Sequence, residues 1–356
     1  MFSGYISKLT VRETSLQSEV ENVQLSEICG FQKESKTKHF PWAVSFTVDG
    51  VNRLGGSIIS PYHILTAAHG FVTTIGVGGN LCVDLAPINR TAYRSIENLQ
   101  KTRKVAYGGR CIRGFTEDLP NSVNCSKSDV VFNKIRSVLL DGDFVGHNCR
   151  DGHDWAIVEV ENQIKFNENV MPICLPRRSM YYTKKLSVPG WGRRYIFNES
   201  GPLIHEIPMR IDPDCRRARP WSDQLPFDAA DYICATSLDT KDYFAPRTCH
   251  GDSGGGMEYR DDDGRAHLIA MTSFGTKGCP SNMLARFTRV DRYIQLISIQ
   301  KADNLNDLLK KNEATIVKNI KLSSKLVNDA KKIVNGTKLT DAERNTINSI
   351  LEKIQQ

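Results

Sequence analysis

The chain has 356 residues, of which 40% are hydrophobic and 24% are charged, and its formal net charge at pH 7 is +7. These values are ordinary for a soluble globular protein. The modest, dispersed charge argues against a nucleic-acid-binding protein, and no apolar run approaches the roughly 18 residues of a membrane span.

The chain contains ten cysteines, and none of them form a CxxC pair with metal-ligand spacing. We therefore expect disulfides, and no metal or other cofactor. Disulfides imply an oxidising compartment, so we predict a secreted protein, although the first twenty residues show no apolar core of a signal peptide. Four glycosylation sequons agree with a secreted glycoprotein: Asn89, Asn124, Asn198 and Asn335.

Three regions follow one another along the chain. Residues 1–28 are polar and aperiodic. Between residues 41 and 290, short β-like runs such as "WAVSFTV", "DWAIVEV" and "HLIAMTSFG" alternate with Gly, Pro, Asn and Asp, which predicts an all-β sandwich or barrel. A short helix is expected at "VDRYIQLISIQ". In residues 300–356 apolar residues recur at helical spacing, and Thr340 with Glu343 forms a capping box, so we predict a helical C-terminal appendage of unknown partner.

The stretch "TCHGDSGGGM", residues 248–257, places Ser253 in a glycine-dense turn. A serine hydroxyl needs a base to become a nucleophile, and the base needs an anion beside it. His69 follows small residues in "LTAAHG". Asp154 directly precedes an apolar strand, where an unpaired aspartate is costly, whereas the competing Asp151 lies in a polar loop.

The order of these residues separates two enzyme classes. The sequence around Ser253 also fits the G-x-S-x-G turn of α/β-hydrolases. Those enzymes place the acid and the histidine after the serine, and only His267 follows here. The α/β-hydrolase interpretation is therefore rejected.

Five segments in register, "LTAAHG", "DWAIVEV", "PGWG", "HGDSGG" and "TSFG", make residues 29–299 resemble the trypsin/chymotrypsin-type serine protease family, and within it the divergent nematode trypsin-like group. The resemblance implies two packed antiparallel six-stranded β-barrels with the active site between them. It divides the chain into an N-terminal segment (1–28), a protease domain (29–299) and a helical tail (300–356).

The resemblance also assigns roles to individual residues. Ser253 is expected to be the nucleophile, His69 the general base and Asp154 its orienting acid, with the N–H groups of Gly251 and Ser253 as the oxyanion hole. Expected substrate-binding residues are Arg247 at the base of the primary specificity pocket, with Thr248, Ser273, Phe274, Gly275 and Ala285. An arginine at that base disfavours Lys and Arg and favours an acidic side chain; pairing of Arg247 with Asp242 would instead favour a small residue.

The family pattern predicts three disulfides, Cys29–Cys174, Cys215–Cys234 and Cys249–Cys279. Two further family bridges lack both partners, which are replaced by Leu54 with Gly70 and by Leu186 with Tyr259. The remaining cysteines, Cys82, Cys111, Cys125 and Cys149, fall in residues 80–150. We interpret this stretch as an inserted surface subregion with two bridges, whose three connectivities stay open.

The sequence departs from the family at the activation site. Between Cys29 and "PWAVSF" no Ile-Val-Gly-Gly occurs, so Asp252 has no visible cationic partner. Two hypotheses remain. The first is an active serine endopeptidase that acts on a protein or peptide substrate and is open to a protein inhibitor. The second is a catalytically silent protease homologue that binds a protein or an inhibitor through the cleft that holds the active site in active family members.

Overall fold

The structure is a computed structural model. It describes residues 7–9, 19–32, 40–72, 96–113, 125, 128–146, 149, 152–176, 183, 185–194, 200–213, 215, 231–276, 278–294 and 297. The predicted helical tail, the four sequons, Cys82 and Asp151 lie outside these residues, so their predictions stay predictions. No helix within the described ranges is long and apolar enough to cross a membrane.

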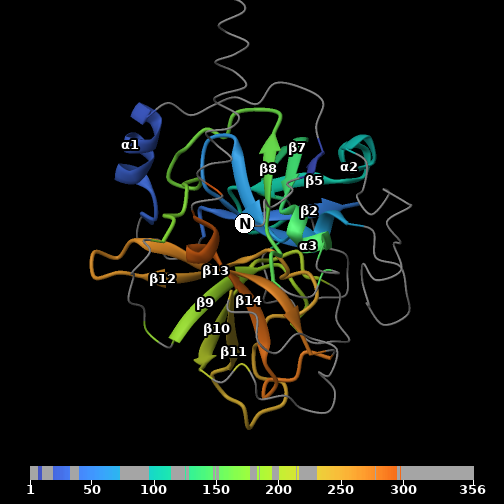
Figure 1. Cartoon of the computed structure of the whole chain (residues 1–356), viewed down its shortest axis with the longest axis vertical. Coiled ribbons are helices and arrows are strands. Elements are labelled where there is room, and N and C mark those ends of the chain that lie inside the picture. The colour runs from blue at the N-terminus through green and yellow to red at the C-terminus, as the bar shows by residue number, and fades with distance from the viewer. Residues whose placement is uncertain are drawn as a thin grey trace, which may run out of the picture. The chain divides into compact units, whose positions relative to one another are not determined.

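The first half of the chain forms an eight-stranded antiparallel sheet with the strand order β1-β7-β8-β4-β3-β2-β5-β6 (Figure 1). Its strands are β1 (Ser7–Leu9), β2 (Ala43–Val48), β3 (Val51–Ile58), β4 (His63–Thr66), β5 (Lys104–Tyr107), β6 (Val131–Asn133), β7 (Ile135–Leu140) and β8 (Ala156–Val160). Their apolar side chains form a core around Phe46, Phe71 and Trp155.

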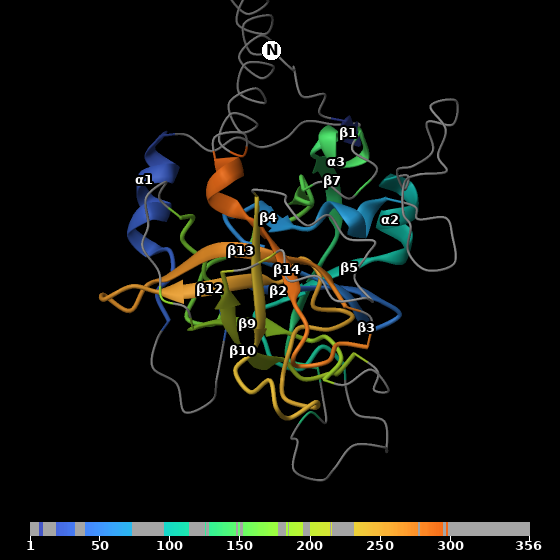
Figure 2. The ribbon, with the colours of Figure 1, turned by 60° about the horizontal axis from the view of Figure 1, so that its bottom comes forward.

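The second half closes into a six-stranded barrel with the order β10-β11-β14-β13-β12-β9 (Figure 2). Its strands are β9 (Lys185–Gly190), β10 (His205–Asp212), β11 (Tyr232–Ser237), β12 (Gly256–Arg260), β13 (Ala266–Gly275) and β14 (Ala285–Arg289). A separate core of Val188, Ile207, Met209, Ile269 and Phe287 fills it. The prediction of an all-β, trypsin-like architecture is confirmed.

Two expectations about the first sheet need correction. It has eight strands and not six, and one of the additional strands is β1, which comes from a segment predicted to be aperiodic and pairs with β7. Residues 80–150 are also more than a surface insertion, since β5, β6 and β7 belong to the sheet. Val105, Ile135 and Val138 are fully buried there, which ties these strands to the core.

Helices are short and peripheral. They are α1 (Glu19–Ile28), the 3₁₀ turn η1 (Ala68–Phe71), α2 (Ile96–Thr102) and α3 (Gly142–Gly146). Residues 290–294, within the stretch "VDRYIQLISIQ", are helical as expected. In Figure 1, α1 and α2 lie on opposite sides of the molecule.

The structure contains the three disulfides that the family pattern predicts: Cys29–Cys174, Cys215–Cys234 and Cys249–Cys279. It also resolves part of the open connectivity, because Cys111 is bonded to Cys125. Cys149 is disulfide-bonded as well. Where one family bridge is missing, Leu54 takes its place: a Cβ on Gly70 would lie 2.5 Å from Leu54 Cδ2, so the leucine packs directly on the glycine.

Candidate active site

His69 and Asp154 are brought together by two neighbouring strands. In the antiparallel pair β4 and β8, Thr66 lies opposite Ala156. The chain that leaves β4 and the chain that enters β8 therefore meet at the same edge. His69 lies three residues after Thr66, in η1, and Asp154 lies two residues before Ala156. The sheet register itself places the two side chains side by side.

Asp154 is completely buried and fully hydrogen-bonded. Its Oδ1 accepts from the His69 backbone N–H at 2.8 Å, and its Oδ2 accepts from His69 Nδ1 at 2.8 Å and from the Ser273 hydroxyl. The histidine is therefore anchored at two points. With Nδ1–H donated to Asp154, the lone pair of Nε2 is left to accept a proton.

The interaction between His69 and Asp154 shifts the pKa values of both side chains. Burial alone would raise the pKa of Asp154, but the nearby His69 charge and the hydrogen bonds from His69 and Ser273 outweigh it and lower that pKa. Burial alone would lower the pKa of His69, but the Asp154 charge and hydrogen bond raise it above 6.5, against a smaller opposing effect of Arg103. The pair thus stabilises an imidazolium, which is what a general base requires after it takes a proton.

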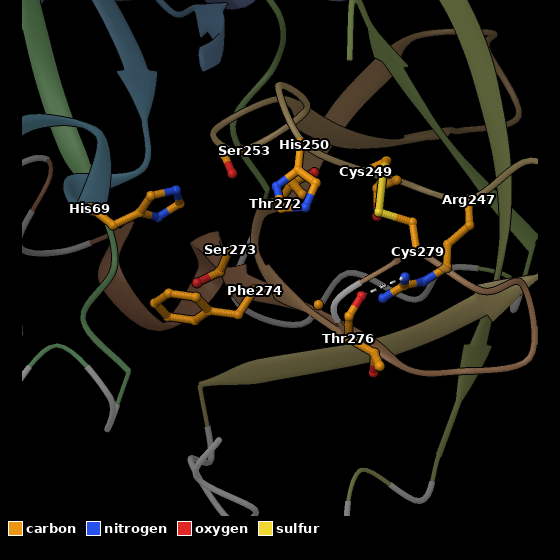
Figure 3. A pocket seen from close by; sticks show the side chains of 12 residues that line it. His69, Arg247, Cys249, His250, Ser253, Thr272, Ser273, Phe274, Thr276 and Cys279 are labelled. Atoms are coloured by element: carbon orange, nitrogen blue, oxygen red, sulfur yellow. Dashed lines mark hydrogen bonds between the residues drawn. A yellow bond between two sulfur atoms is a disulfide. The ribbon is translucent and has the colours of Figure 1, made fainter. Parts of the chain in front are cut away.

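Ser253 lies before β12 and faces His69 across a cavity of about 230 Å³ (Figure 3). Figure 3 marks no hydrogen bond between the Ser253 hydroxyl and the His69 ring. A loose contact of this kind is common in unliganded active sites. Phe274 stacks on the His69 ring at a centroid distance of 5.4 Å and forms another wall.

Two backbone donors lie at this turn without a partner. Among the described residues, neither the Gly251 N–H nor the Ser253 N–H has a hydrogen-bond acceptor. Gly251 has φ +97°, a conformation that L side chains rarely adopt, and a Cβ there would lie 2.6 Å from Ser200 Oγ. Glycine is therefore required, and the two free donors can serve a developing oxyanion.

Three polar groups that the sequence did not reveal hold this turn. Asn52 Nδ2, on β3, donates to the Gly251 carbonyl at 2.8 Å. The Arg193 N–H and the Ser200 hydroxyl donate to the His250 carbonyl at 2.8 and 3.4 Å. Because that carbonyl is held, the peptide N–H of Gly251 points the opposite way. Asn52 and Gly251 are 199 residues apart, and no local sequence pattern signals such a contact.

Asp252 is buried without a cation. Its two oxygens accept from the backbone N–H groups of Gly192 and Cys249 at 2.8 and 2.9 Å, and no ion pair reaches it among the described residues. Burial raises its pKa to about 7 against these two hydrogen bonds. A Cβ on Gly190 or Gly192 would lie 2.1 or 2.3 Å from the carboxylate, which explains both glycines of "PGWG".

The Arg247 guanidinium lies in the wall of the same cavity and is only 3% exposed. It donates to the carbonyls of Leu284 at 2.9 Å and Thr276 at 3.5 Å, and it makes no ion pair among the described residues. Its Nε and the Thr248 hydroxyl are buried with no partner. Burial lowers the pKa of Arg247 to about 10, with a further contribution from Arg286. Its partners are the two carbonyls, and no ion pair joins Arg247 to Asp242, both of which the structure describes.

Most of the predicted substrate-binding residues come together. The cavity is lined by Arg247, Thr248, Ser273, Phe274 and Gly275, and also by His250 and Thr272, which sequence reasoning missed. Gly275 is needed beside the arginine, because a Cβ there would lie 2.5 Å from Arg247 Nη2. Ala285 is the cross-strand partner of Gly275 but does not line the cavity.

The sequence of the chain is similar to the sequences of known trypsin-like proteases. The family model described as Trypsin matches residues 126–297. The chain is 26% identical over 282 residues to the "Trypsin-like protease try-5" of Caenorhabditis elegans, an alignment that covers 73% of this chain and 80% of the relative. It is 26% identical to the "Proclotting enzyme" of Tachypleus tridentatus, with 77% of this chain and 69% of the relative covered. The "Clotting factor G beta subunit" of the same animal is 24% identical, with 80% and 86% covered.

Proposed function

Because the chain belongs to the trypsin-like serine protease family, we propose that it is an active serine endopeptidase that cleaves proteins or peptides through an acyl-enzyme on Ser253. One observation carries the proposal. His69, hydrogen-bonded to the buried Asp154, lines one cavity with Ser253, and the N–H groups of Gly251 and Ser253 in the same turn have no acceptor among the described residues. A catalytically silent descendant has no reason to keep all of these together.

Each active-site group has a defined role in this mechanism. Ser253 Oγ attacks the scissile carbonyl while His69 Nε2 takes its proton and later passes it to the leaving amine. Asp154 stays ionised and holds the imidazole in the right tautomer. The N–H groups of Gly251 and Ser253 stabilise the oxyanion. Residues Ser273–Gly275, at the end of β13, offer their backbone to an extended substrate by strand addition.

The first test is labelling of the purified full chain with a fluorophosphonate probe, because covalent capture needs the nucleophile, the base and the oxyanion hole together. We expect the wild type to label, and Ser253→Ala and His69→Ala not to label. Asp154→Asn should slow labelling by several orders of magnitude, on the order of 10⁴-fold, because it stabilises the wrong tautomer. Asp151→Asn is the matched control, and a larger loss there would assign the acid to Asp151.

The labelling rate also has a predictable pH dependence. His69 must be neutral to accept the Ser253 proton, and its pKa is raised above 6.5 by Asp154. We therefore expect the rate to rise with pH through a midpoint above 6.5. A flat profile between pH 6 and 8 would contradict the role of His69 as general base.

We also propose that the enzyme disfavours Lys and Arg before the scissile bond and accepts an acidic side chain. Support comes from the unpaired Arg247 guanidinium and from the unpartnered Thr248 hydroxyl in the cavity wall. An acidic side chain can accept hydrogen bonds from both groups and neutralise the buried charge. If the guanidinium keeps its two carbonyl partners when substrate binds, small residues are accepted instead.

Profiling with a peptide library tests this preference. We expect cleavage after Asp or Glu, and Arg247→Ala should reduce it by at least 10-fold while improving cleavage after uncharged residues. Thr276→Ala is the comparison, because Thr276 also lines the cavity but binds Arg247 through its backbone carbonyl, which the substitution retains; it shows whether the loss of any lining side chain has the same effect. Efficient cleavage after Lys or Arg by the wild type would contradict both forms of the proposal.

The silent homologue remains the competing function, and Asp252 favours it, since this carboxylate has no cation among the described residues. A folded wild type that never labels but binds a protein ligand would establish it. Either function fits an extracellular location, which we propose from the disulfides. Glycosylation at the four sequons belongs to the same proposal.

A further inference from the structure

The segment that leads into Asp154 has a strained backbone. Gly152 and the next residue, His153, both have positive φ, at +81° and +60°. A left-handed conformation is easy for glycine, but it costs a residue such as histidine about 1–3 kcal/mol. Such a conformation persists only where surrounding contacts enforce it. The orientation of the next residue, Asp154, depends on this turn.

The second barrel holds the backbone of the turn. The His153 N–H donates to Asp231 Oδ2 at 3.0 Å and to the Tyr293 hydroxyl at 2.9 Å. The Tyr293 hydroxyl in turn donates to Asp231. The Gly152 N–H donates to the Tyr232 hydroxyl, on β11, at 3.3 Å. These groups lie at or beside β11 and in the helical residues that follow β14.

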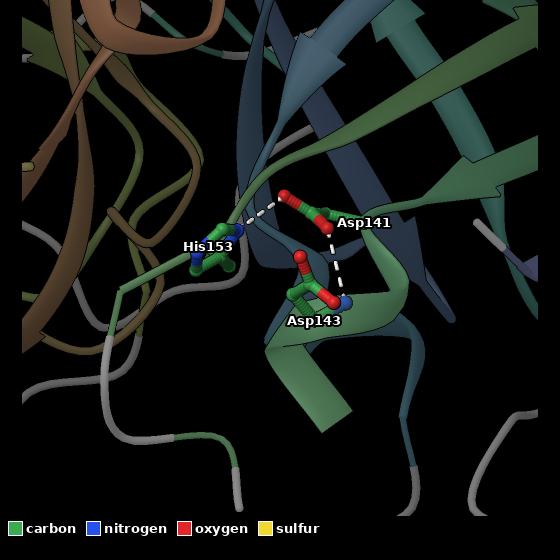
Figure 4. A group of neighbouring side chains, drawn as sticks. All are labelled: Asp141, Asp143 and His153. Atoms are coloured by element: carbon green, nitrogen blue, oxygen red, sulfur yellow. Dashed lines mark hydrogen bonds and ion pairs between the residues drawn. The ribbon is translucent and has the colours of Figure 1, made fainter. Parts of the chain in front are cut away.

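The first sheet holds the side chain of the same residue. His153 Nδ1 donates to Asp141 Oδ2 at 2.7 Å, and Figure 4 shows the two side chains facing each other. Asp141 directly follows β7 and is itself fixed, because its Oδ1 accepts from the Asp143 N–H at 3.0 Å. Its own N–H donates to the Trp155 carbonyl at 3.4 Å, so it spans the turn on which Asp154 lies. Asp141 is only 3% exposed.

We propose that His153 is a positioning residue for the catalytic acid: its charged hydrogen bond to Asp141, together with the Asp231–Tyr293 pair, holds the strained turn that aims Asp154 at His69. His153 does not touch the reacting atoms and acts only through Asp154. The inference rests on the proposed function for its kinetic measurements.

The charge of His153 matters to this role. Asp141, Asp143, Asp231 and Tyr293 are the titratable groups that face it among the described residues. Burial alone would lower the pKa of His153, but the hydrogen bond and charge of Asp141, then the charges of Asp143 and Asp231, raise it. A charged donor binds a carboxylate about twice as strongly as a neutral one. Catalysis should therefore need neutral His69 and protonated His153, so the rate should fall at alkaline pH as His153 loses its proton.

The test compares three variants of the full chain. His153→Asn removes the ring charge, and asparagine tolerates positive φ. Asp141→Asn keeps the shape and removes the anion. His267→Asn is the control, because His267 forms the same kind of bond to Asp261, at 2.8 Å, at the start of β13 and is not among the residues that line the cavity. We expect the first two to lower kcat or the labelling rate 10–100-fold, with KM unchanged and the alkaline fall lost. The control should keep the kcat and pH profile of the wild type.

A second measurement does not depend on activity. Histidine NMR titration of His69 reports how closely Asp154 is held against it, so the pKa of His69 should fall toward 6.5 in His153→Asn and Asp141→Asn only. If the wild type never labels, the proposed function fails, but this titration still decides the positioning role. If His153→Asn does not fold, Asp141→Asn decides by the same measurements. A kcat within twofold of wild type, an unchanged alkaline limb or an unchanged His69 pKa would overturn the inference.

Discussion

At the scale of single residues, the buried carboxylate of Asp252 directly precedes the nucleophile and sets the conditions under which the active-site turn is stable. Its only partners among the described residues are two backbone N–H groups. These two hydrogen bonds compensate only part of the free-energy cost of burying an anion. The uncompensated part raises the pKa of Asp252 to about 7. The turn therefore depends on the protonation of Asp252 near neutral pH.

This dependence predicts how stability varies with pH. A group whose pKa is raised on folding stabilises the fold fully below its unfolded pKa, near 3.8, and loses that contribution as pH rises through about 7. Asparagine carries no charge at any pH. The melting temperature of Asp252→Asn, relative to wild type, should therefore increase by roughly several °C between pH 5 and 8.

The control for this measurement is Asp239→Asn. Hydrogen bonds from the backbone of Lys241 and Asp242 lower the pKa of that exposed carboxyl, so it is ionised throughout this pH range. Its difference from wild type should stay constant. A constant difference for Asp252→Asn as well would mean that a cation compensates Asp252 in solution.

At the scale of elements, the end of α1 is fixed by the β12–β13 hairpin. The Arg265 guanidinium donates to the last-turn carbonyls of Ser26 at 2.7 Å and Glu27 at 3.1 Å, and it lies 4.2 Å from the Phe31 ring centroid. A cation suits the negative end of the helix dipole. The chain then reaches Cys29, which is bonded to Cys174, and turns at Gly30, with φ +72°. Arg265 thus links the N-terminal helix to the second barrel.

Removing this link should loosen α1 alone. We expect Arg265→Ala to speed hydrogen exchange of the α1 amides about 5–10-fold, which corresponds to roughly 1 kcal/mol for a partly exposed charged hydrogen bond. Arg265→Lys should fall in between, because it keeps the charge but loses the two-armed geometry. Arg53→Ala, on an exposed position of β3, is the control. Faster exchange across the second barrel would show that Arg265 stabilises more than the helix.

At the scale of the whole molecule, the eight-stranded sheet and the barrel meet through glycines. The Gly55 N–H, on β3, donates to the Ser253 carbonyl at 2.6 Å. A Cβ on Gly55 would lie 2.9 Å from both Cα and N of Gly255. Both are backbone atoms and cannot give way as a flexible side chain can. The close approach of the sheet and the barrel beside Ser253 therefore requires glycine at position 55.

Gly55→Ala should therefore damage the active site from outside it. We expect a loss of stability of about 1–3 kcal/mol from overpacking and at least a 10-fold slower fluorophosphonate labelling. Gly201→Ala is the matched control, because its new Cβ would meet nothing closer than 3.6 Å and its φ is not positive. Unchanged labelling of Gly55→Ala would mean that the sheet and the barrel adjust without moving Ser253.

The sequence by itself determined the architecture and the candidate residues, because these depend on local and ordered signals. Alternating apolar runs predicted an all-β fold, and the order His69, Asp154, Ser253 excluded the α/β-hydrolase arrangement. The pairing of Cys249 with Cys279 followed from the same register, and the structure contains that bridge. The tail after residue 299 was also separated from the rest on composition, and it stays a prediction.

Only the tertiary structure decided which distant groups support those residues. The pairing of β1 with β7 and the position of Arg247 between two carbonyls join residues far apart in the chain. The bonds from Asn52 to the Gly251 carbonyl and from the His153 N–H to Tyr293 do the same. A hydrogen bond leaves no periodic pattern in sequence, because its energy depends on where two segments meet and not on their neighbours along the chain. The chemistry could therefore be predicted from local motifs, while the contacts that position it could not.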